Sequence, residues 1–312
     1  MKNIICTLFL LASHFVSAGF AASNKINHVI YVTLDGARWQ DVLQYQKNFP
    51  KLWQRHAAKM IIYGMPSGDK VMEVASVPVS LPSYQSQMTG KLQPCQNNEC
   101  GQVKAQTLPE YLLSRLKLRR QDVAVFSSWP VIANALESKK GTVYSNVGNL
   151  PVIDPLTGQP DVIMAEINHL QTLKHHIKTN RFDEYTFAQS LHYFEKYRPV
   201  FMWISLVNAD NEAHMDHPYQ YHEMLLSYDQ YLDSLFAKLQ QMKLEENTMV
   251  IITTDHGRGN GVHWTSHGDE YPESKQTWAM VMNGKLKPVR VDGRASYYNT
   301  LSIRPAIEEA LL

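Results

Sequence analysis

The chain of 312 residues has no excess charge of either sign, because 30 lysines and arginines stand against 29 aspartates and glutamates. The formal net charge of +1 gives no signal for binding nucleic acid or an anionic membrane surface. Internal repeats and low-complexity linkers are also absent from the sequence, which excludes solenoids and disordered tethers. The hydrophobic content of 44% instead indicates a globular protein with a large core.

Long hydrophobic runs are missing as well. The apolar stretch from Ile4 to Ala12 is too short to cross a bilayer as a helix. It follows a lysine and precedes small residues, the pattern of a secretory signal peptide, here over residues 1–22 with cleavage after Ala18 or Ala21. An uncleaved N-terminal anchor is the alternative. We expect an exported protein, periplasmic or secreted, with no stable membrane span after cleavage.

Cysteine is scarce, with three residues in the whole chain. Cys6 would leave with the signal peptide, so the mature protein would keep Cys95 and Cys100 in a polar loop. A pair in an exported protein favours a disulfide, which would act as a local clip because the loop it closes is very short. The pair alone cannot form a tetrahedral zinc site, since that needs four ligands.

Short apolar runs alternate with helical patterns along the chain. Continuous apolar strands separated by helices predict an α/β fold, a mostly parallel central sheet buried on both faces and flanked by helices. We expect one catalytic domain over residues 23–312, in which the less regular segment 136–182 forms a small cap or an edge hairpin. The predicted strands are 28–36, 122–129, 199–210 and 247–257. The predicted helices are 49–60, 81–91, 107–118, 183–197, 219–243 and 299–312.

Three of these strands end in aspartate, at Asp35, Asp210 and Asp255. Ligands of open α/β sheets bind beyond the carboxyl ends of the strands, so the three carboxylates should meet there. They would repel one another unless cations lay between them, which predicts a metal site. For any one of them, a helix cap or a turn is the alternative.

Histidines follow the aspartates at short spacing. His214 stands four residues after Asp210, one helical turn away, while His256 and His267 follow Asp255. Carboxylate and imidazole ligands together favour zinc, with manganese or iron as alternatives. We expect His217 and His222 to be merely solvated, and His263 is open between substrate contact and packing near Trp264.

A serine nucleophile is predicted at Ser80, at the start of the helix that contains Pro82. A helix N-terminus offers free N–H groups to a phosphate, and metal coordination can lower the pKa of a serine hydroxyl. A purely structural N-cap is the alternative, and three other serines compete on sequence alone: Ser76, Ser83 and Ser86.

Five short motifs, in order along nearly the whole mature chain, resemble the alkaline phosphatase superfamily. They are VTLDGARW (32–39), SLPSYQSQMTG (80–90), DNEAH (210–214), TTDHGRG (253–259) and SHG (266–268). The resemblance implies a three-layer fold and a two-metal phosphoric ester hydrolase, a phosphatase or phosphodiesterase, with a metal-activated Ser80 and a phosphoseryl intermediate. It further implies one divalent metal, zinc or manganese, on Asp210, His214 and His267, and a second on Asp35, Asp255, His256 and Ser80.

The resemblance leaves the branch of the superfamily open. The early position of His267 is more similar to the mutase and compact phosphatase branches than to nucleotide pyrophosphatases. Tyr84 stands where sulfatases have arginine, which disfavours a sulfatase, and the signal peptide disfavours a cytosolic mutase. The phosphate-binding asparagine of some phosphodiesterases has no clear match, so Asn97 and Asn98 are left out of the site. A sulfatase and a non-catalytic binding protein remain alternatives, and we expect a small phosphate ester as substrate.

Overall fold

The computed structural model describes residues 25–174 and 180–312, so the predicted signal peptide lies outside the described residues. A seven-stranded sheet has the strand order β2-β9-β7-β1-β6-β4-β5. The run from β7 to β5 pairs in parallel, and only β9 runs antiparallel to its neighbours β7 and β2. The predicted mostly parallel sheet is therefore confirmed. Its strands are β1 (His28–Leu34), β2 (Met60–Tyr63), β4 (Val123–Ser127), β5 (Tyr144–Val147), β6 (Phe201–Leu206), β7 (Thr248–Thr253) and β9 (Ala279–Met282).

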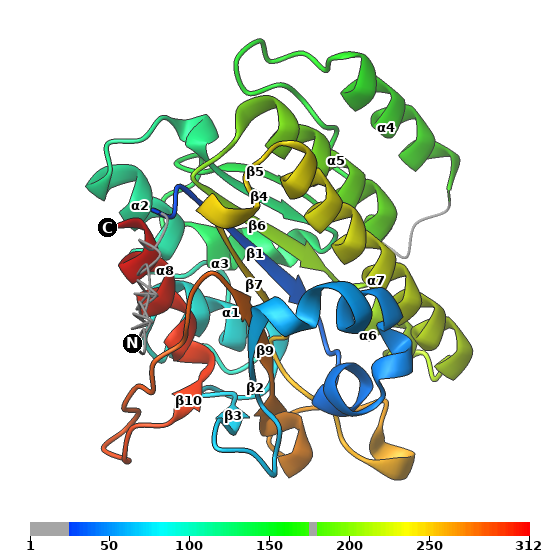
Figure 1. Cartoon of the computed structure of the whole chain (residues 1–312), viewed down its shortest axis with the longest axis vertical. Helices are drawn as coiled ribbons and strands as arrows, with labels where there is room; N and C mark the ends of the chain where they lie inside the picture. The colour runs from blue at the N-terminus through cyan, green and yellow to red at the C-terminus, as the bar shows by residue number, and fades with distance from the viewer. Residues whose placement is uncertain (1–24, 175–179) are drawn as a thin grey trace, which may run out of the picture.

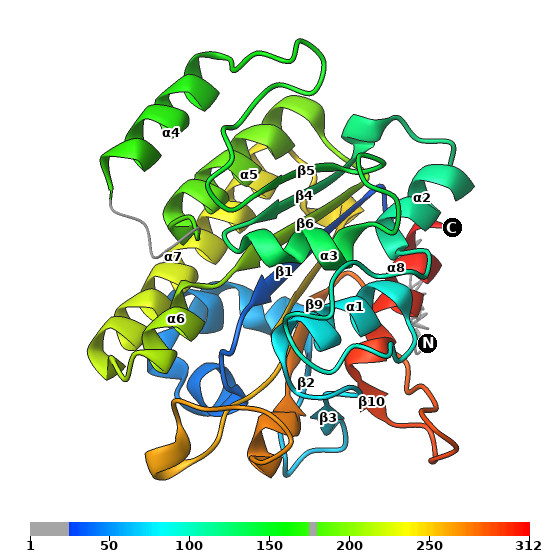
Figure 2. The ribbon, with the colours of Figure 1, turned by 180° about the vertical axis from the view of Figure 1, so that it is seen from behind.

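Helices cover both faces of the sheet (Figures 1 and 2), which explains why its strands are apolar without a break. In β1, Val29 and Tyr31 belong to the core on one face, and Ile30 and Val32 belong to the core on the other. The first face carries α1 (Ser80–Thr89), α2 (Leu108–Arg115), α3 (Ala133–Leu136) and α8 (Ile303–Leu311). The second carries α5 (Asp183–Tyr197), α6 (Asn208–His214) and α7 (Pro218–Gln241).

A second sheet of three very short strands was not predicted, because two-residue strands leave no periodic pattern in the sequence. Its order is β10-β3-β8. The strands are β3 (Met72–Glu73), β8 (Gln276–Thr277) and β10 (Tyr298–Asn299).

The helix predicted over residues 49–60 is wrong as a regular α-helix. The chain forms a π-helical turn at Leu52–His56 and a 3-10 turn at Ala57–Lys59. Packing on α7 sets this winding: the Asp229 carboxylate accepts hydrogen bonds from the N–H groups of Lys51 and Leu52, at 3.1 and 2.8 Å. Tertiary contacts thus override the local helical pattern.

The strand predicted over 199–210 is also too long, because β6 ends at Leu206 and α6 begins at Asn208. The buried carboxylate of Asp183 accepts hydrogen bonds from the N–H groups of Val207 and Asn208, at 3.0 and 2.8 Å, and so supports the start of α6. Asp210 therefore lies in the first turn of a helix, one turn before His214.

The segment 136–182 contributes β5 as a parallel edge strand rather than as half of a hairpin. It also holds α4 (Val162–Leu173), which packs through Met164 and Ile167 against Tyr185 of α5. Figure 1 shows α4 outside the layer formed by α5 and α7. Whether this segment caps the active face stays a prediction.

Ion pairs attach α4 and its loop to α5. Lys196 Nζ lies 2.6 Å from Asp154 Oδ2 and 2.7 Å from Asp161 Oδ2, and His192 Nε2 lies 2.9 Å from the same Asp161 oxygen. Burial opposes ionisation of Asp154, but its bonds to Lys196 and Tyr197 prevail and lower its pKa from 3.8 to about 2. This contribution to stability is complete above pH 3.8 and is lost as the pH falls towards 2.

We predict that Lys196→Met loosens α4 at neutral pH much as acid loosens it in the wild type. Hydrogen exchange should quicken over residues 150–173, while β1 and β7 keep their protection, because the sheet makes no use of this ion pair. Lys238→Met, which removes a pair between Lys238 of α7 and the more exposed Glu195, is the control. Equal exchange over 150–173 in both variants would contradict the prediction.

Cys95 and Cys100 form the predicted disulfide, with their Cα atoms 5.4 Å apart.

Among residues 25–174 and 180–312, every helix is too short or too polar to reach across a bilayer.

Candidate active site

The central strands deliver two carboxylates to the same level of the sheet. β1 and β7 pair in register at Thr33 and Thr253, so Asp35 and Asp255 each follow two residues beyond this pair. The N–H of Gly36 donates to Asp255 Oδ1 at 3.1 Å and joins the two strand ends. Gly36 has φ +63°, and a Cβ there would lie 2.3 Å from an oxygen of Asp210, so only glycine fits.

Asp35, Asp255 and His256 form the first candidate cation group. One ligand atom from each lies within 4.8 Å of the others, and all three side chains are buried. His256 Nε2 is 3.7 Å from Asp35 Oδ1 and 3.4 Å from Asp255 Oδ2. Neither of these two oxygens has a hydrogen-bond partner among the described residues. Two buried oxygens without donors are the arrangement that a cation would satisfy.

A second group contains Asp210, His256 and His267, again with ligand atoms within 4.8 Å. His214, which sequence reasoning placed here, is close as well: its Nε2 lies 3.3 Å from Asp210 Oδ2 and 3.1 Å from His267 Nε2. The imidazoles of His256 and His267 stack with their centroids 3.8 Å apart. His256 therefore lies between the two groups, whereas the resemblance placed it with one.

Hydrogen bonds orient the buried imidazole of His256 and the half-buried imidazole of His267. His256 Nδ1 is 2.8 Å from the carbonyl oxygen of Gly257, and His267 Nδ1 is 3.0 Å from that of Pro78. A carbonyl oxygen only accepts, so each Nδ1 carries the proton and each Nε2 presents a lone pair to the site. Burial lowers the pKa of His256 to about 4 and that of His267 to about 3. Both rings are consequently neutral at pH 7, as metal ligands must be.

Burial disfavours the charged form of the three site carboxylates, Asp35, Asp210 and Asp255. Burial raises the pKa of Asp35 well above its usual value, and the carboxylates of Asp255 and Asp210 raise it further. Burial and Asp210 raise the pKa of Asp255 to about 6. Burial also opposes the charge of Asp210, but the Arg258 guanidinium outweighs it and holds the pKa of Asp210 well below its usual value. Divalent cations would relieve the repulsion at Asp35 and Asp255, so the donor set fits them.

Ser80 begins α1 at the edge of both groups. Its Oγ lies 3.2 Å from His256 Nε2, and the side chain is buried. It is the first helical residue rather than the N-cap, which is Val79. Two neighbours on α1 serve the site differently: Ser83 donates to the carbonyl of Asp255 at 2.7 Å, and Tyr84 donates to Asp35 Oδ2 at 3.1 Å.

The competing serines do not reach this position. The Ser76 hydroxyl donates to its neighbour's carbonyl at 3.1 Å, and the Ser86 hydroxyl has no hydrogen-bond partner within the described ranges. Among the histidines left open, His263 is exposed and faces Tyr271, with ring centroids 5.4 Å apart. His217 is exposed and pairs with Glu212.

A model of the family "type I phosphodiesterase / nucleotide pyrophosphatase" matches residues 29–306, which include every residue of the site. The chain belongs to this family. The short distance in sequence from His256 to His267, which resembles the mutase branch, therefore occurs in a member of the phosphodiesterase family. No curated protein matches the chain.

Solved structures with the same fold include phosphatases and sulfatases. A 2-O GAG sulfatase aligns with a TM-score of 0.62 at 13% identity, over 92% of this chain and 71% of that one. A protein of the alkaline phosphatase superfamily from Vibrio parahaemolyticus aligns with a TM-score of 0.59 at 11% identity, over 91% and 66%. The alkaline phosphatase PafA aligns with 0.55 at 13%, over 78% and 65%. The family match places the protein among hydrolases of phosphate esters, and the solved structures show the fold that it shares with them.

Arg258 is a site residue that sequence reasoning missed. Its guanidinium is buried, pairs through Nη1 with Asp210 Oδ1, and donates to the carbonyls of Trp264 and Thr265 at 2.8 and 2.6 Å. It therefore orients Asp210 and ties the 261–268 loop to the site. The one available signal was a lone arginine between two glycines directly after Asp255 and His256.

We predict that Arg258→Met lowers the free energy of unfolding of the metal-free protein by about 3–5 kcal/mol, because it strands the buried Asp210 carboxylate. Urea unfolding measures the loss. Arg55→Met is the control, since Arg55 pairs with Asp233 at 2.9 Å but is 59% exposed and should cost less. Equal losses in the two variants would contradict the prediction.

Asn98, which the sequence analysis left out of the site, lies beside Ser80 in the structure. Its Oδ1 accepts a hydrogen bond from the N–H of Leu81, at 2.9 Å, directly after Ser80. Asn98 therefore contacts the start of α1. It belongs to the loop that follows α1 in the chain, and no regular pattern in the sequence of this loop predicts where it returns.

Proposed function

We propose that the protein is an exported two-metal phosphoric ester hydrolase in which Ser80 is the nucleophile. The observation that carries this proposal is the position of Ser80 Oγ, buried and 3.2 Å from His256 Nε2, where the two carboxylate–imidazole groups meet. The family match supports a phosphate ester as substrate. The Cys95–Cys100 disulfide supports export, because disulfides persist in oxidising compartments.

Two divalent cations, zinc or manganese, would supply the positive charge that stabilises attacking and leaving oxygens in such sites. The residues that would hold them are Asp35, Ser80, Asp255 and His256 for one, and Asp210, His214 and His267 for the other. His256 lies between the two groups, but its one free lone pair, on Nε2, would bind a single cation.

The protein's own groups orient the reaction. Ser80 Oγ lies 3.2 Å from His256 Nε2, and the bond from His256 Nδ1 to the Gly257 carbonyl orients this imidazole towards the nucleophile. Ser80 Oγ would attack phosphorus, expel the alcohol and form a phosphoserine, which water would then hydrolyse. The positive end of the α1 dipole favours a phosphate beside Ser80. Asn98, which already meets Leu81 there, would contact a phosphate oxygen.

Cleavage of p-nitrophenyl phosphate, bis-p-nitrophenyl phosphate and p-nitrophenyl sulfate, measured side by side on metal-reconstituted protein, tests the proposal. We expect a phosphate ester to be cleaved faster than the sulfate, in line with Tyr84 bonding to Asp35 where sulfatases have arginine. Preference for the sulfate would favour a sulfatase. Purified mature protein without activity or bound metal would favour a binding protein.

A further inference from the structure

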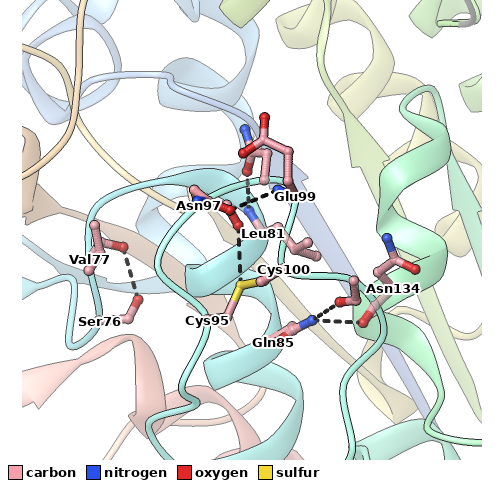
Figure 3. The surroundings of a disulfide bond; sticks show 11 residues. Ser76, Val77, Leu81, Gln85, Cys95, Asn97, Glu99, Cys100 and Asn134 are labelled. Atoms are coloured by element: carbon pink, nitrogen blue, oxygen red, sulfur yellow. Dashed lines mark hydrogen bonds between the residues drawn. A yellow bond between two sulfur atoms is a disulfide. The ribbon is translucent and has the colours of Figure 1, made fainter.

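The loop that carries Asn98 folds back along the helix it has just left. It starts at Gly90, which ends α1 in the left-handed conformation with φ +67°, and it returns to the other end of that helix, where Asn98 meets Leu81. The two cysteines bracket this contact from residues 95 and 100 (Figure 3). The disulfide therefore closes a ring of six residues around Asn98 and crosslinks no distant elements.

Both ends of the ring are fixed, while the ring itself has few other attachments. Cys95 is buried in the core beside α1. Gln85 of α1 donates to the carbonyls of Gly101 and Asn134, at 2.7 and 3.0 Å, and so holds the chain just after Cys100. Inside the ring, the N–H of Glu99 donates to Asn97 Oδ1 at 3.0 Å. Figure 3 shows the bond between Glu99 and Asn97 near Leu81, and the bonds of Gln85 on the other side of the cysteines, towards Asn134.

We propose that the Cys95–Cys100 disulfide is a positioning device for the active site: it holds the Asn98 amide over the start of α1, beside Ser80. This inference rests on the proposed function and adds to it two positioning residues that touch neither substrate nor metal. Without the bond, residues 96–99 gain conformational freedom, and Asn98 must be ordered anew in each catalytic cycle. The loss then falls on turnover and on the binding of phosphate.

A double-mutant cycle separates positioning from general stabilisation. The variants are Cys95→Ser/Cys100→Ser, Asn98→Ala and the triple combination, each assayed with the p-nitrophenyl ester that the wild type cleaves best. Loss of one oxyanion donor predicts that Asn98→Ala lowers kcat/KM by about 10²-fold. Misplacement of the same donor predicts a loss on the order of tenfold for the cysteine variant, mainly in kcat. The triple variant should be no worse than Asn98→Ala.

Two further measurements exclude a merely structural effect. Metal content by mass spectrometry should be unchanged in the cysteine variant, and its affinity for inorganic phosphate, as a competitive inhibitor, should fall with kcat. Gln96→Ala, an exposed position in the same ring, is the matched control and should leave turnover unchanged. If the double replacement does not fold, Cys100→Ser alone breaks the bond at its exposed end and leaves the buried Cys95 in place.

An additional tenfold loss in the triple variant would overturn the inference, because the disulfide would then act independently of Asn98. Unchanged turnover in the cysteine variant would also overturn it. Ser80→Ala, assayed in parallel, separates the two proposals. If that variant is as active as the wild type, the proposed function fails; if it is inactive while the cycle is additive, only the positioning role fails.

Discussion

Ser80→Ala is expected to lower kcat for phosphate esters by at least about 10³-fold, since an enzyme without its nucleophile keeps only the acceleration from binding and electrostatic stabilisation. The fold should survive, because within the described part of the chain the Ser80 side chain bonds only to His256, and the N-cap of α1 is Val79 rather than Ser80. Initial rates with the p-nitrophenyl esters measure the loss, and circular dichroism checks the fold. Metal content should stay close to that of the wild type.

Ser76→Ala is the matched control, because Ser76 lies four residues earlier and its hydroxyl donates to the carbonyl of the neighbouring Val77. It should retain wild-type turnover. Acid quench of the wild type during turnover should trap a phosphoserine at residue 80, detectable by peptide mass spectrometry. Wild-type turnover in Ser80→Ala with its metal bound would refute the nucleophile, and a phosphoserine at position 83 or 86 would move it elsewhere on α1.

The carboxylates of Asp35 and Asp255 could be predicted as site residues, because the carboxyl ends of neighbouring parallel strands lie close together irrespective of the helices that connect them. Asp35 and Asp255 follow continuous apolar runs, so their convergence required only the sheet order. The four-residue spacing of Asp210 and His214 predicted that they lie together, even though the predicted strand 199–210 extends past the true end of β6. The spacing stayed informative because both residues lie on α6, one turn apart.

What could not be predicted depends on contacts between distant segments. Arg258 and Asn98 reach the site through loops, and no periodicity marks where a loop returns. The sharing of His256 between the two groups follows from ring stacking on His267, eleven residues further along the chain. The same limit explains the error at 49–60, where Asp229 of α7 sets the winding of a distant segment.

Chelation of divalent metal is expected to abolish turnover and to lower the melting temperature together. Bound cations stabilise the native state by mass action, about 4 kcal/mol at a free concentration 1,000 times the dissociation constant. They would also offset the burial and the repulsion between carboxylates, which together raise the pKa values of Asp35 and Asp255. Calorimetry with EDTA, and then with added zinc or manganese, measures the loss and its recovery.

Asp255→Asn separates these two contributions, because it should have opposite effects in the two states. In metal-free protein it removes a buried charge whose Oδ2 has no partner within the described residues, and it keeps the oxygen that accepts from Gly36. The metal-free variant should therefore melt higher than the metal-free wild type, while it binds less metal and loses turnover.

Asp41→Asn is the control for Asp255→Asn, since Asp41 is equally a buried carboxylate but is satisfied by Arg38 and Tyr221. It should lower the melting temperature in both states and leave the metal content unchanged. If Asp255→Asn instead lowered the stability of the metal-free protein as Asp41→Asn does, Asp255 would be a structural carboxylate. The buried carboxylate of Asp255, just after β7, would then stabilise the fold and would not bind a cation.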